Sequence, residues 1–257
     1  MNTGKKMNQR HDRLISMVKK RGYITVKEMS NRLDVSTTTI RKDITFLDQA
    51  GYLSKCRGGA CPSPLTRHFD KGIYTEMFHN EKNRIAKAVT VMIDDDSSLF
   101  IDVGTTSSYV AKELFKYKDR LKVVTNNLEA AAILSKRKDF EVFITGGIVP
   151  NNGGGMMGES VMEFINQFKV DVALIGSSGL DHDGSLLTKN YHQCHVPKMM
   201  IKNSRVVYLA LDHTQFGKCE MVRFGNIQQI DTMITDRKPP INLMKIISNN
   251  GVSLIIS

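Results

Sequence analysis

The chain has 257 residues, of which 41% are hydrophobic and 24% charged, a composition typical of a soluble globular protein with a sizeable core. No stretch approaches the roughly 18 consecutive apolar residues of a membrane span. Residues 1–9 are polar and lack the apolar centre of a signal peptide, and four cysteines in so long a chain do not make a disulfide framework. We therefore expect a cytoplasmic protein without a membrane partner.

The net charge of +10 is unevenly distributed along the chain. Residues 1–75 contain 15 Lys and Arg against 6 Asp and Glu, a net charge of +9, whereas the rest of the chain has a net charge of only +1. A basic segment of this kind suits binding to a polyanion such as nucleic acid. A solvated basic tail would have the same charge, but it would lack the folding signals that this segment contains.

Three short helices are predicted within the basic segment. The first covers residues 10–21, which place apolar side chains on one face. Thr25 and Glu28 form a capping box at the start of the second helix. Ser36 caps the third, whose apolar side chains recur at i, i+4 and i+7 (Ile40, Ile44 and Leu47).

The polar face of the third helix has side chains that suit a DNA major groove. Short hydroxyls at its N-terminus reach phosphates and base edges, and the longer Arg41 and Lys42 bond bases or clamp the flanking backbone. The helix therefore has the character of a recognition helix.

A β-hairpin is predicted directly after this helix. Residues 52–60 form a short wing with a tight Gly58-Gly59 end. Two helices at this spacing plus a wing predict a winged helix-turn-helix, which we place at residues 7–62. A three-helix bundle that binds a protein partner has the same helices, but the localised charge argues against it. The candidate contacts to double-stranded operator DNA are Thr25, Ser36, Thr37, Thr38, Thr39, Arg41, Lys42, Thr45, Lys55 and Arg57.

These segments resemble the helix-turn-helix of the DeoR family of bacterial sugar-metabolism repressors. The resemblance lies in residues 22–28 (GYITVKE), 35–44 (VSTTTIRKDI) and 57–60 (RGGA). It implies a transcription regulator, usually a repressor, that binds operator DNA. Asp43 lies within the second segment, and we interpret it as the partner of an Arg or Lys in an ion pair rather than as a base contact.

A linker separates the basic domain from a larger one. Residues 61–66 contain two prolines, and we place the linker at 63–75 and the second domain at 76–257. An amphipathic helix at 81–93 is followed by short apolar runs that are mostly separated by helical stretches. This alternation predicts an α/β fold with a mostly parallel sheet covered on both faces. The predicted strands are 99–102, 121–125, 142–145, 172–175, 206–211 and 233–235.

The loops after these strands predict a site for a phosphorylated ligand. Ligands of parallel sheets bind at the carboxyl ends of strands, and Gly104-Thr105-Thr106 follows one strand and opens a helix, whose N–H groups and positive end favour an anion. Three further loops repeat this pattern of Gly, Ser, Thr and Asn. The candidate effector-binding residues, with Lys198 as the expected cation, are Asp102, Gly104, Thr105, Thr106, Asn126, Gly146, Gly147, Ser177, Ser178, Asp181, Lys198 and Asp212.

The same loops resemble the sensor domain of the DeoR family, which is related in fold to ribose-5-phosphate isomerase and CoA transferases. The resemblance lies in residues 102–106 (DVGTT), 124–127 (VTNN), 176–179 (GSSG) and 212–217 (DHTQFG). It implies that a small phosphorylated sugar or polyol, glycerol 3-phosphate or a related sugar phosphate, binds this domain and releases the DNA.

Two segments depart from the usual family pattern. Residues 193–198 (QCHVPK) lack two acidic residues that the family usually has, and proline replaces a cation. Gln215 stands where the family usually has lysine. Because Gln193, His195, Pro197 and Gln215 lie beside the expected pocket, the identity of the effector stays open, as does the operator sequence.

We expect no metal and no cofactor. His192 and His195 lie close together in sequence but lack a third and fourth ligand, and Cys56 and Cys61 lack a second pair. The alternative function is a sugar-phosphate isomerase-like enzyme, which needs a carboxylate or lysine poised for proton transfer; the missing acids weaken it. One winged head buries too little surface for selective binding, so we expect a homo-oligomer, either a dimer or a tetramer.

Overall fold

The computed structural model divides the chain into two compact units, residues 1–77 and 78–257. The structure describes residues 9–49, 52–56, 58–62, 78–150 and 155–257. The predicted linker at 63–75 and the candidate Arg57 lie outside the described residues.

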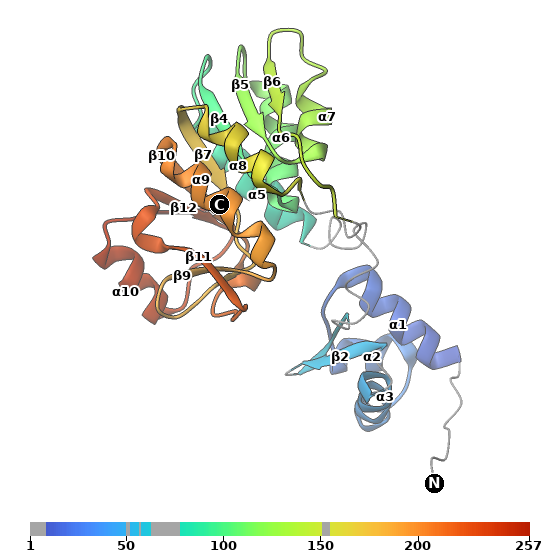
Figure 1. Cartoon of the computed structure of the whole chain (residues 1–257). Helices are drawn as coiled ribbons and strands as arrows, with labels where there is room; N and C mark the ends of the chain where they lie inside the picture. Colours follow the sequence, from blue (N-terminus) through green and yellow to red (C-terminus); the bar gives the residue numbers. More distant parts are fainter. Residues whose placement is uncertain (1–8, 50–51, 57, 63–77, 151–154) are drawn as a thin grey trace. The chain divides into compact units, whose positions relative to one another are not determined.

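The first unit contains the predicted winged helix-turn-helix (Figure 1). Its buried core is apolar and draws on all three helices and on the strands, with Leu14, Ile24, Met29, Ile40 and Leu47 fully buried. A small antiparallel sheet has the order β1-β3-β2. The elements are α1 (Gln9–Arg21), β1 (Ile24–Thr25), α2 (Val26–Leu33), α3 (Thr37–Gln49), β2 (Leu53–Cys56) and β3 (Gly59–Pro62).

Two predicted side-chain caps start the helices of the motif. The Thr25 hydroxyl accepts a hydrogen bond from the N–H of Glu28 at 3.1 Å, and the Ser36 hydroxyl accepts one from the N–H of Thr39 at 3.2 Å. The carboxylate of Glu28 pairs with Arg21 at 2.6 Å. The N-cap half of the predicted capping box is therefore present, while Glu28 also fastens α2 to the end of α1.

The two glycines of the wing have different roles. Gly58 has a φ of +81°, which suits a turn. Gly59 already belongs to β3, so the predicted Gly58-Gly59 end of the hairpin was wrong in detail. A Cβ at Gly59 would lie 2.1 Å from the carbonyl oxygen of Ile24, so this residue lets β1 approach β3 closely.

A buried ion pair joins the recognition helix α3 to α1. Asp43 is 2% exposed and accepts hydrogen bonds from Arg10 at 2.6 Å and from the fully buried His11 at 3.1 Å. Burial by itself raises the pKa of Asp43, but the hydrogen bonds from Arg10 and His11 outweigh burial and lower it below its ordinary value. The interpretation of Asp43 as an ion-pair residue is confirmed.

The second unit is built on a parallel seven-stranded sheet with the order β13-β12-β10-β7-β4-β5-β6. The strands of this sheet are β4 (Ser98–Ile101), β5 (Lys122–Thr125), β6 (Glu141–Ile144), β7 (Val170–Ile175), β10 (Ser204–Leu211), β12 (Thr232–Thr235) and β13 (Ser253–Ile256). The predicted α/β class and all six predicted strands are confirmed. The sequence missed β13 and a small antiparallel sheet made of β8 (Gly179–Leu180), β9 (Ser185–Thr188) and β11 (Val222–Asn226).

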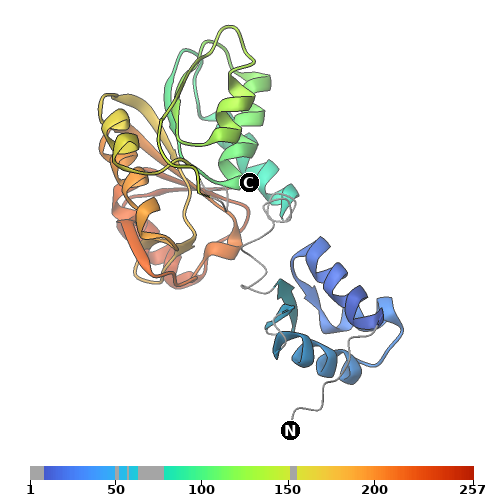
Figure 2. The same ribbon diagram turned by 45° about the vertical axis from the view of Figure 1, so that its right-hand side comes forward.

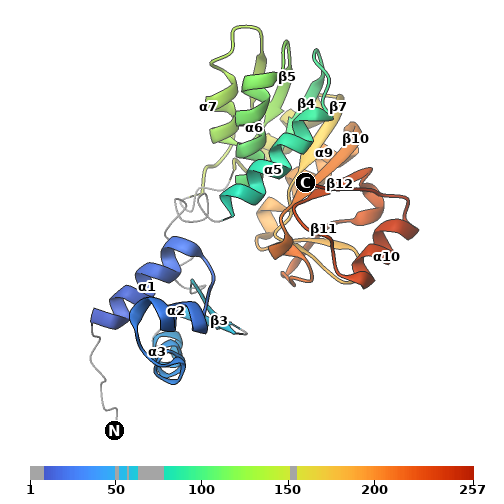
Figure 3. The same ribbon diagram turned by 180° about the vertical axis from the view of Figure 1, so that it is seen from behind.

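Helices cover both faces of the large sheet, as Figures 2 and 3 show. Neighbouring residues of one strand point to opposite faces: Leu99 packs with the first helix layer, and Phe100 packs with the second. The first layer is α5 (His79–Val91), α6 (Thr105–Tyr117) and α7 (Leu128–Leu134); the second is α8 (Glu159–Asn166), α9 (His195–Lys202) and α10 (Ile241–Asn249).

Short 3-10 turns complete the unit at η1 (Tyr191–Gln193), η2 (His213–Gln215) and η3 (Ile227–Gln229). Within the described ranges, no helix has the length and apolar character that a membrane crossing requires.

The Asp43 ion pair gives a first prediction. A hydrogen bond to a charged group contributes about 1.5–3 kcal/mol. Asp43→Asn removes the charge, so it lowers the unfolding free energy of the first unit by at least about one such contribution. Hydrogen exchange of the α1 and α3 amides in the full chain measures the loss. Asp34→Asn is the matched control, because Asp34 is exposed and its φ of +51° is well tolerated by Asn. Equal protection in both variants would contradict the prediction.

Candidate functional site

The polar face of α3 presents the predicted DNA contacts to solvent. Thr38, Arg41 and Lys42 are exposed, whereas the Thr45 hydroxyl donates to the carbonyl oxygen of Arg41 at 2.9 Å. Ser36 and Thr25 are also exposed, but their hydroxyls already accept helix N–H groups. Exposed cations on one helix face suit direct contact with bases and phosphates.

The wing is attached to the recognition helix through Lys55. Its N–H donates to the Asp48 carboxylate at 3.0 Å, and its Nζ donates to the Thr45 hydroxyl at 3.5 Å. Two predicted contacts, Thr45 on α3 and Lys55 on β2, are thereby brought together. The sequence prediction missed Asp48, whose signal was an acidic side chain at the end of an otherwise basic helix face.

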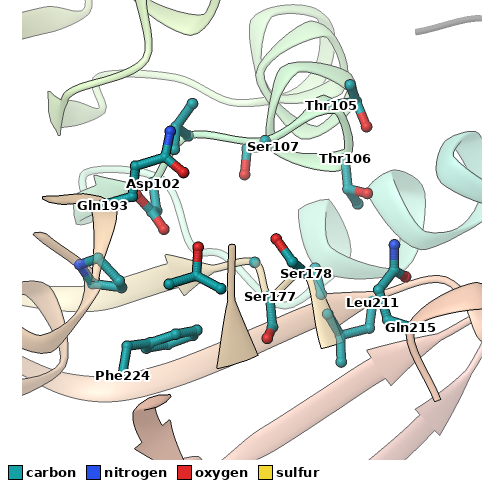
Figure 4. Close-up of a pocket in the computed structure, with 16 residues that line it drawn as sticks. Asp102, Thr105, Thr106, Ser107, Ser177, Ser178, Gln193, Leu211, Gln215 and Phe224 are labelled. Atoms are coloured by element: carbon teal, nitrogen blue, oxygen red, sulfur yellow. The ribbon is translucent and has the colours of Figure 1, made fainter. Parts of the chain in front are cut away.

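A pocket of about 150 Å³ lies at the carboxyl ends of β4, β7 and β10. From β4 the chain adds β5 and β6 on one side of the sheet. From β7 it adds β10 and β12 on the other side, so the order of strand addition reverses between β4 and β7. Crevices that bind ligands form at such a switch point. Figure 4 shows the hydroxyls of Ser107 and Ser178 directed into the space between the start of α6 and the strand ends.

Half of the predicted effector residues line this pocket: Asp102, Gly104, Thr105, Thr106, Ser177 and Ser178. The other half lie outside its lining. Gly146 and Gly147 follow β6, which is two strands away from β4. Asp181 lies in the turn between β8 and β9, where its carboxylate accepts the N–H of His182, and Lys198 is exposed on α9.

The pocket also contains residues outside the candidate effector set. Ser107 extends the hydroxyls of α6, and the second sheet adds Thr188 and Phe224. Thr188 and Phe224 lie on antiparallel strands that the sequence missed, whereas Ser107 lies on the predicted helix after Gly104. Three of the four departures from the family pattern line the pocket as well: Gln193, Pro197 and Gln215.

Asp102 is the titratable group in the wall of this pocket. It is 4% exposed, and burial raises its pKa to about 7, although hydrogen bonds from the Val103 N–H and the Asn126 side chain lower it in part. Asn126, itself 2% exposed, also donates to the carbonyl oxygen of Met156 at 3.4 Å. Asn126 therefore links Asp102 to the backbone of Met156 through hydrogen bonds.

A buried lysine, Lys82 on α5, lies beside Asp212. Burial lowers the pKa of Lys82, and the charge of Asp212 opposes that effect. Asp212, 2% exposed, accepts hydrogen bonds from the Thr214 N–H at 3.0 Å and from Gln215 Nε2 at 3.5 Å. Asp212 therefore both accepts a hydrogen bond from the pocket residue Gln215 and acts electrostatically on Lys82. Lys82 was detectable in the sequence, because it falls on the apolar stripe of α5 at i, i+3, i+4 and i+7 with Ile85, Ala86 and Val89.

Two pocket side chains have buried oxygen atoms without a hydrogen-bond partner among the described residues: Asp102 Oδ1 and Gln215 Oε1. Buried polar atoms are nearly always paired in native proteins. Both oxygens can accept a hydrogen bond from a ligand hydroxyl. The pocket therefore combines a helix N-terminus that suits an anion with acceptors that suit hydroxyl groups.

Family models match both units. The DeoR-like helix-turn-helix domain matches residues 10–62, and the DeoR C-terminal sensor domain matches residues 77–237. The chain belongs to the DeoR family. It is a DNA-binding transcriptional repressor of the class that controls sugar and polyol metabolism.

Relatives match over nearly the whole length. The chain is 38% identical to the glycerol-3-phosphate regulon repressor of Escherichia coli (strain K12), over 97% of this chain and 98% of that protein. It is 36% identical to the repressor of the same name from Haemophilus influenzae, over 91% of each chain. The HTH-type transcriptional repressor CsqR of Escherichia coli (strain K12) is 33% identical, over 97% of this chain and 95% of that protein.

Solved structures resemble the second unit more distantly. A D-ribose-5-phosphate isomerase in complex with phospho-erythronic acid is 16% identical, with a TM-score of 0.41 over 54% of each chain. A likeness of this size carries no statement about activity.

Arg41 gives a prediction for DNA recognition. Since Arg41 is exposed on α3, Arg41→Ala weakens binding to the operator by about 1–3 kcal/mol, with much less effect on random-sequence DNA. Gel-shift titration against both duplexes measures the ratio of affinities. Arg13→Ala removes the same charge from an exposed position of α1 and lowers both affinities alike. An unchanged ratio in Arg41→Ala would remove Arg41 from base readout.

Proposed function

We propose that the chain represses an operon for sugar or polyol catabolism and is released from its operator by a small phosphorylated metabolite that binds the pocket at the start of α6. The observation behind this proposal is the unpaired acceptor Asp102 Oδ1 in a pocket that also contains the N-terminus of α6. The names of the relatives make glycerol 3-phosphate the first candidate.

The phosphate group takes the position next to Gly104, Thr105 and Thr106. Backbone N–H groups in the first turn of a helix have no intrahelical partner, and the helix dipole favours negative charge there. The hydroxyls of the metabolite then donate to Asp102 and Gln215, whose oxygens lack partners among the described residues. Asp212 holds Gln215 through a hydrogen bond, and its charge acts on the buried Lys82. Lys198 lies outside the pocket lining.

Release of DNA requires that the metabolite binds one arrangement of the DNA-binding units more tightly than another. A difference of about 1–3 kcal/mol is typical of such coupling. We propose a homo-oligomer, a dimer or a tetramer, with at least two units on the operator, since one winged unit buries little DNA surface. Binding to chromosomal DNA also makes the cytoplasm the expected location.

An isomerase of sugar phosphates is the second candidate, because a carboxyl group with a pKa of about 7 could move a proton. We propose sensing without catalysis. Incubation with ribose 5-phosphate and with glycerol 3-phosphate distinguishes the two functions. A raised melting temperature without a changed ligand supports the sensor, and turnover supports the enzyme.

Thr105 gives a prediction for the binding site. Thr105→Glu places a negative charge at the phosphate position and weakens effector binding by about tenfold or more, while operator binding in the absence of effector is retained. Thr105→Gln adds similar bulk without the charge and is the matched control. Calorimetry with the phosphate that stabilises the wild type in a thermal-shift screen measures affinity. Normal binding by Thr105→Glu would place the phosphate elsewhere.

Asp102 gives a prediction for pH. Its carboxyl group is neutral below its pKa of about 7 and charged above it, and the charged form repels the bound phosphate. Effector affinity therefore falls as the pH rises through 7, by up to about tenfold per pH unit if only the neutral form binds.

Calorimetry between pH 6 and pH 8.5 measures this effect. Asp102→Asn resembles the neutral acid and has a flatter profile, apart from the ionisation of the phosphate itself, whose second pKa is about 6. The same profile in both proteins would show that Asp102 does not control binding.

A further inference from the structure

The wing contains two thiols that the DNA-binding function does not use. Cys56 on β2 and Cys61 on β3 are not disulfide-bonded, and both are half-buried. Both donate to the same atom, the carbonyl oxygen of Ser54, at 3.7 Å and 3.5 Å respectively. The two sulfur atoms are therefore no further apart than the sum of those distances, and both side chains turn toward one point on the hairpin.

The strand register explains this approach. Ser54 pairs with Cys61 and Cys56 pairs with Gly59, so Cys56 and Cys61 are diagonal neighbours on one face of the hairpin. Leu53 and Ala60, the neighbours on the other face, are buried in the core. The thiols thus lie on the face opposite Leu53 and Ala60. Part of that face is covered, since Gly59 is buried against Tyr23 and Ile24, but both thiols are only half-buried and a small solute can reach them.

A diagonal pair is wider than an unstrained disulfide, whose Cβ atoms are about 3.5–4.5 Å apart. Joining the two sulfurs therefore requires the hairpin to twist. A strained disulfide is more easily reduced than a relaxed one, which makes the bond reversible.

The twist would act on the attachment of the wing to the recognition helix. Lys55 precedes Cys56, and it holds β2 to α3 through Asp48 and Thr45. Drawing Cys56 toward Cys61 pulls β2 at this attachment. We propose that Cys56 and Cys61 form a reversible redox pair, and that their oxidation by a hydroperoxide weakens operator binding.

The chemistry is balanced with hydrogen peroxide as the oxidant. The thiolate of one cysteine attacks the peroxide, cleaves the O–O bond and becomes a sulfenic acid, with release of one water. The second thiol attacks that sulfur, forms the S–S bond and expels a second water. Two thiols and one peroxide thus give one disulfide and two waters, and a small dithiol reductant reverses the step by exchange.

The test measures bond formation and DNA affinity separately, in the full chain. A duplex selected from a random-sequence pool by the reduced protein serves as the operator. Mass spectrometry after treatment with hydrogen peroxide detects the Cys56–Cys61 bond as the loss of two hydrogen atoms. Gel-shift titration before oxidation, after oxidation and after reduction with dithiothreitol gives the affinities.

We expect the bond in the wild type, with operator affinity lowered roughly tenfold and restored by reduction. Cys56→Ser and Cys61→Ser bind the operator normally and lose the response to peroxide. Cys219→Ser keeps it, which excludes the exposed Cys219 as the source. Failure of the bond to form, or its formation without a change in affinity, would overturn the proposal. Because the reduced protein selects the duplex before oxidation, a protein that does not bind DNA at all is recognised at that step, separately from the effect of peroxide.

Discussion

The pairing of β4 with β7 determines where the pocket of the second unit lies. These two parallel strands are adjacent, but the chain leaves them in opposite directions, so a crevice opens at their carboxyl ends. Asp102 follows β4 and Ser177 follows β7, and both therefore face one pocket. Because α6 begins three residues after Asp102, its N-terminus opens into the same space. The site thus follows from the strand order rather than from any single motif.

The periodicity of the sequence was sufficient to predict the parallel sheet but not the complete pocket. Each central strand is a short apolar run, which buried parallel strands require. Gly146-Gly147 resembled the other loops chemically, yet it follows β6, and only the strand order shows that this loop lies away from the switch point. Thr188 and Phe224 enter the pocket on antiparallel strands with little sequence signal.

Lys82 shows a different limit of sequence reasoning. Within an amphipathic helix it appeared as one more charged residue, although its spacing placed it on the apolar face. A lysine on such a face is retained only where a partner offsets the cost of burial, and Asp212 lies far away in sequence. The sequence therefore showed that a lysine lies on an apolar helix face, but it did not show that Asp212 offsets its burial. Nor did it show that His11 is paired with Asp43 across the first unit.

The two units meet negatively charged ligands by different physical means. The first unit uses net charge: exposed Arg and Lys side chains displace counterions from DNA, an effect that weakens steeply with salt. The second unit is nearly neutral, and Gln215 stands in its pocket wall in place of the usual family lysine.

Without that lysine, the positive potential in the pocket comes from the N-terminus of α6, equivalent to roughly half an elementary charge. An anion held by fixed N–H groups and hydroxyls in a pocket is screened less than one held on an open surface. Rising ionic strength therefore weakens operator binding more than effector binding. In the proposed site, Asp102 and Gln215 each present an acceptor that only a correctly placed donor can satisfy, so selectivity would depend on the placement of the ligand's hydroxyl groups as well as on its charge.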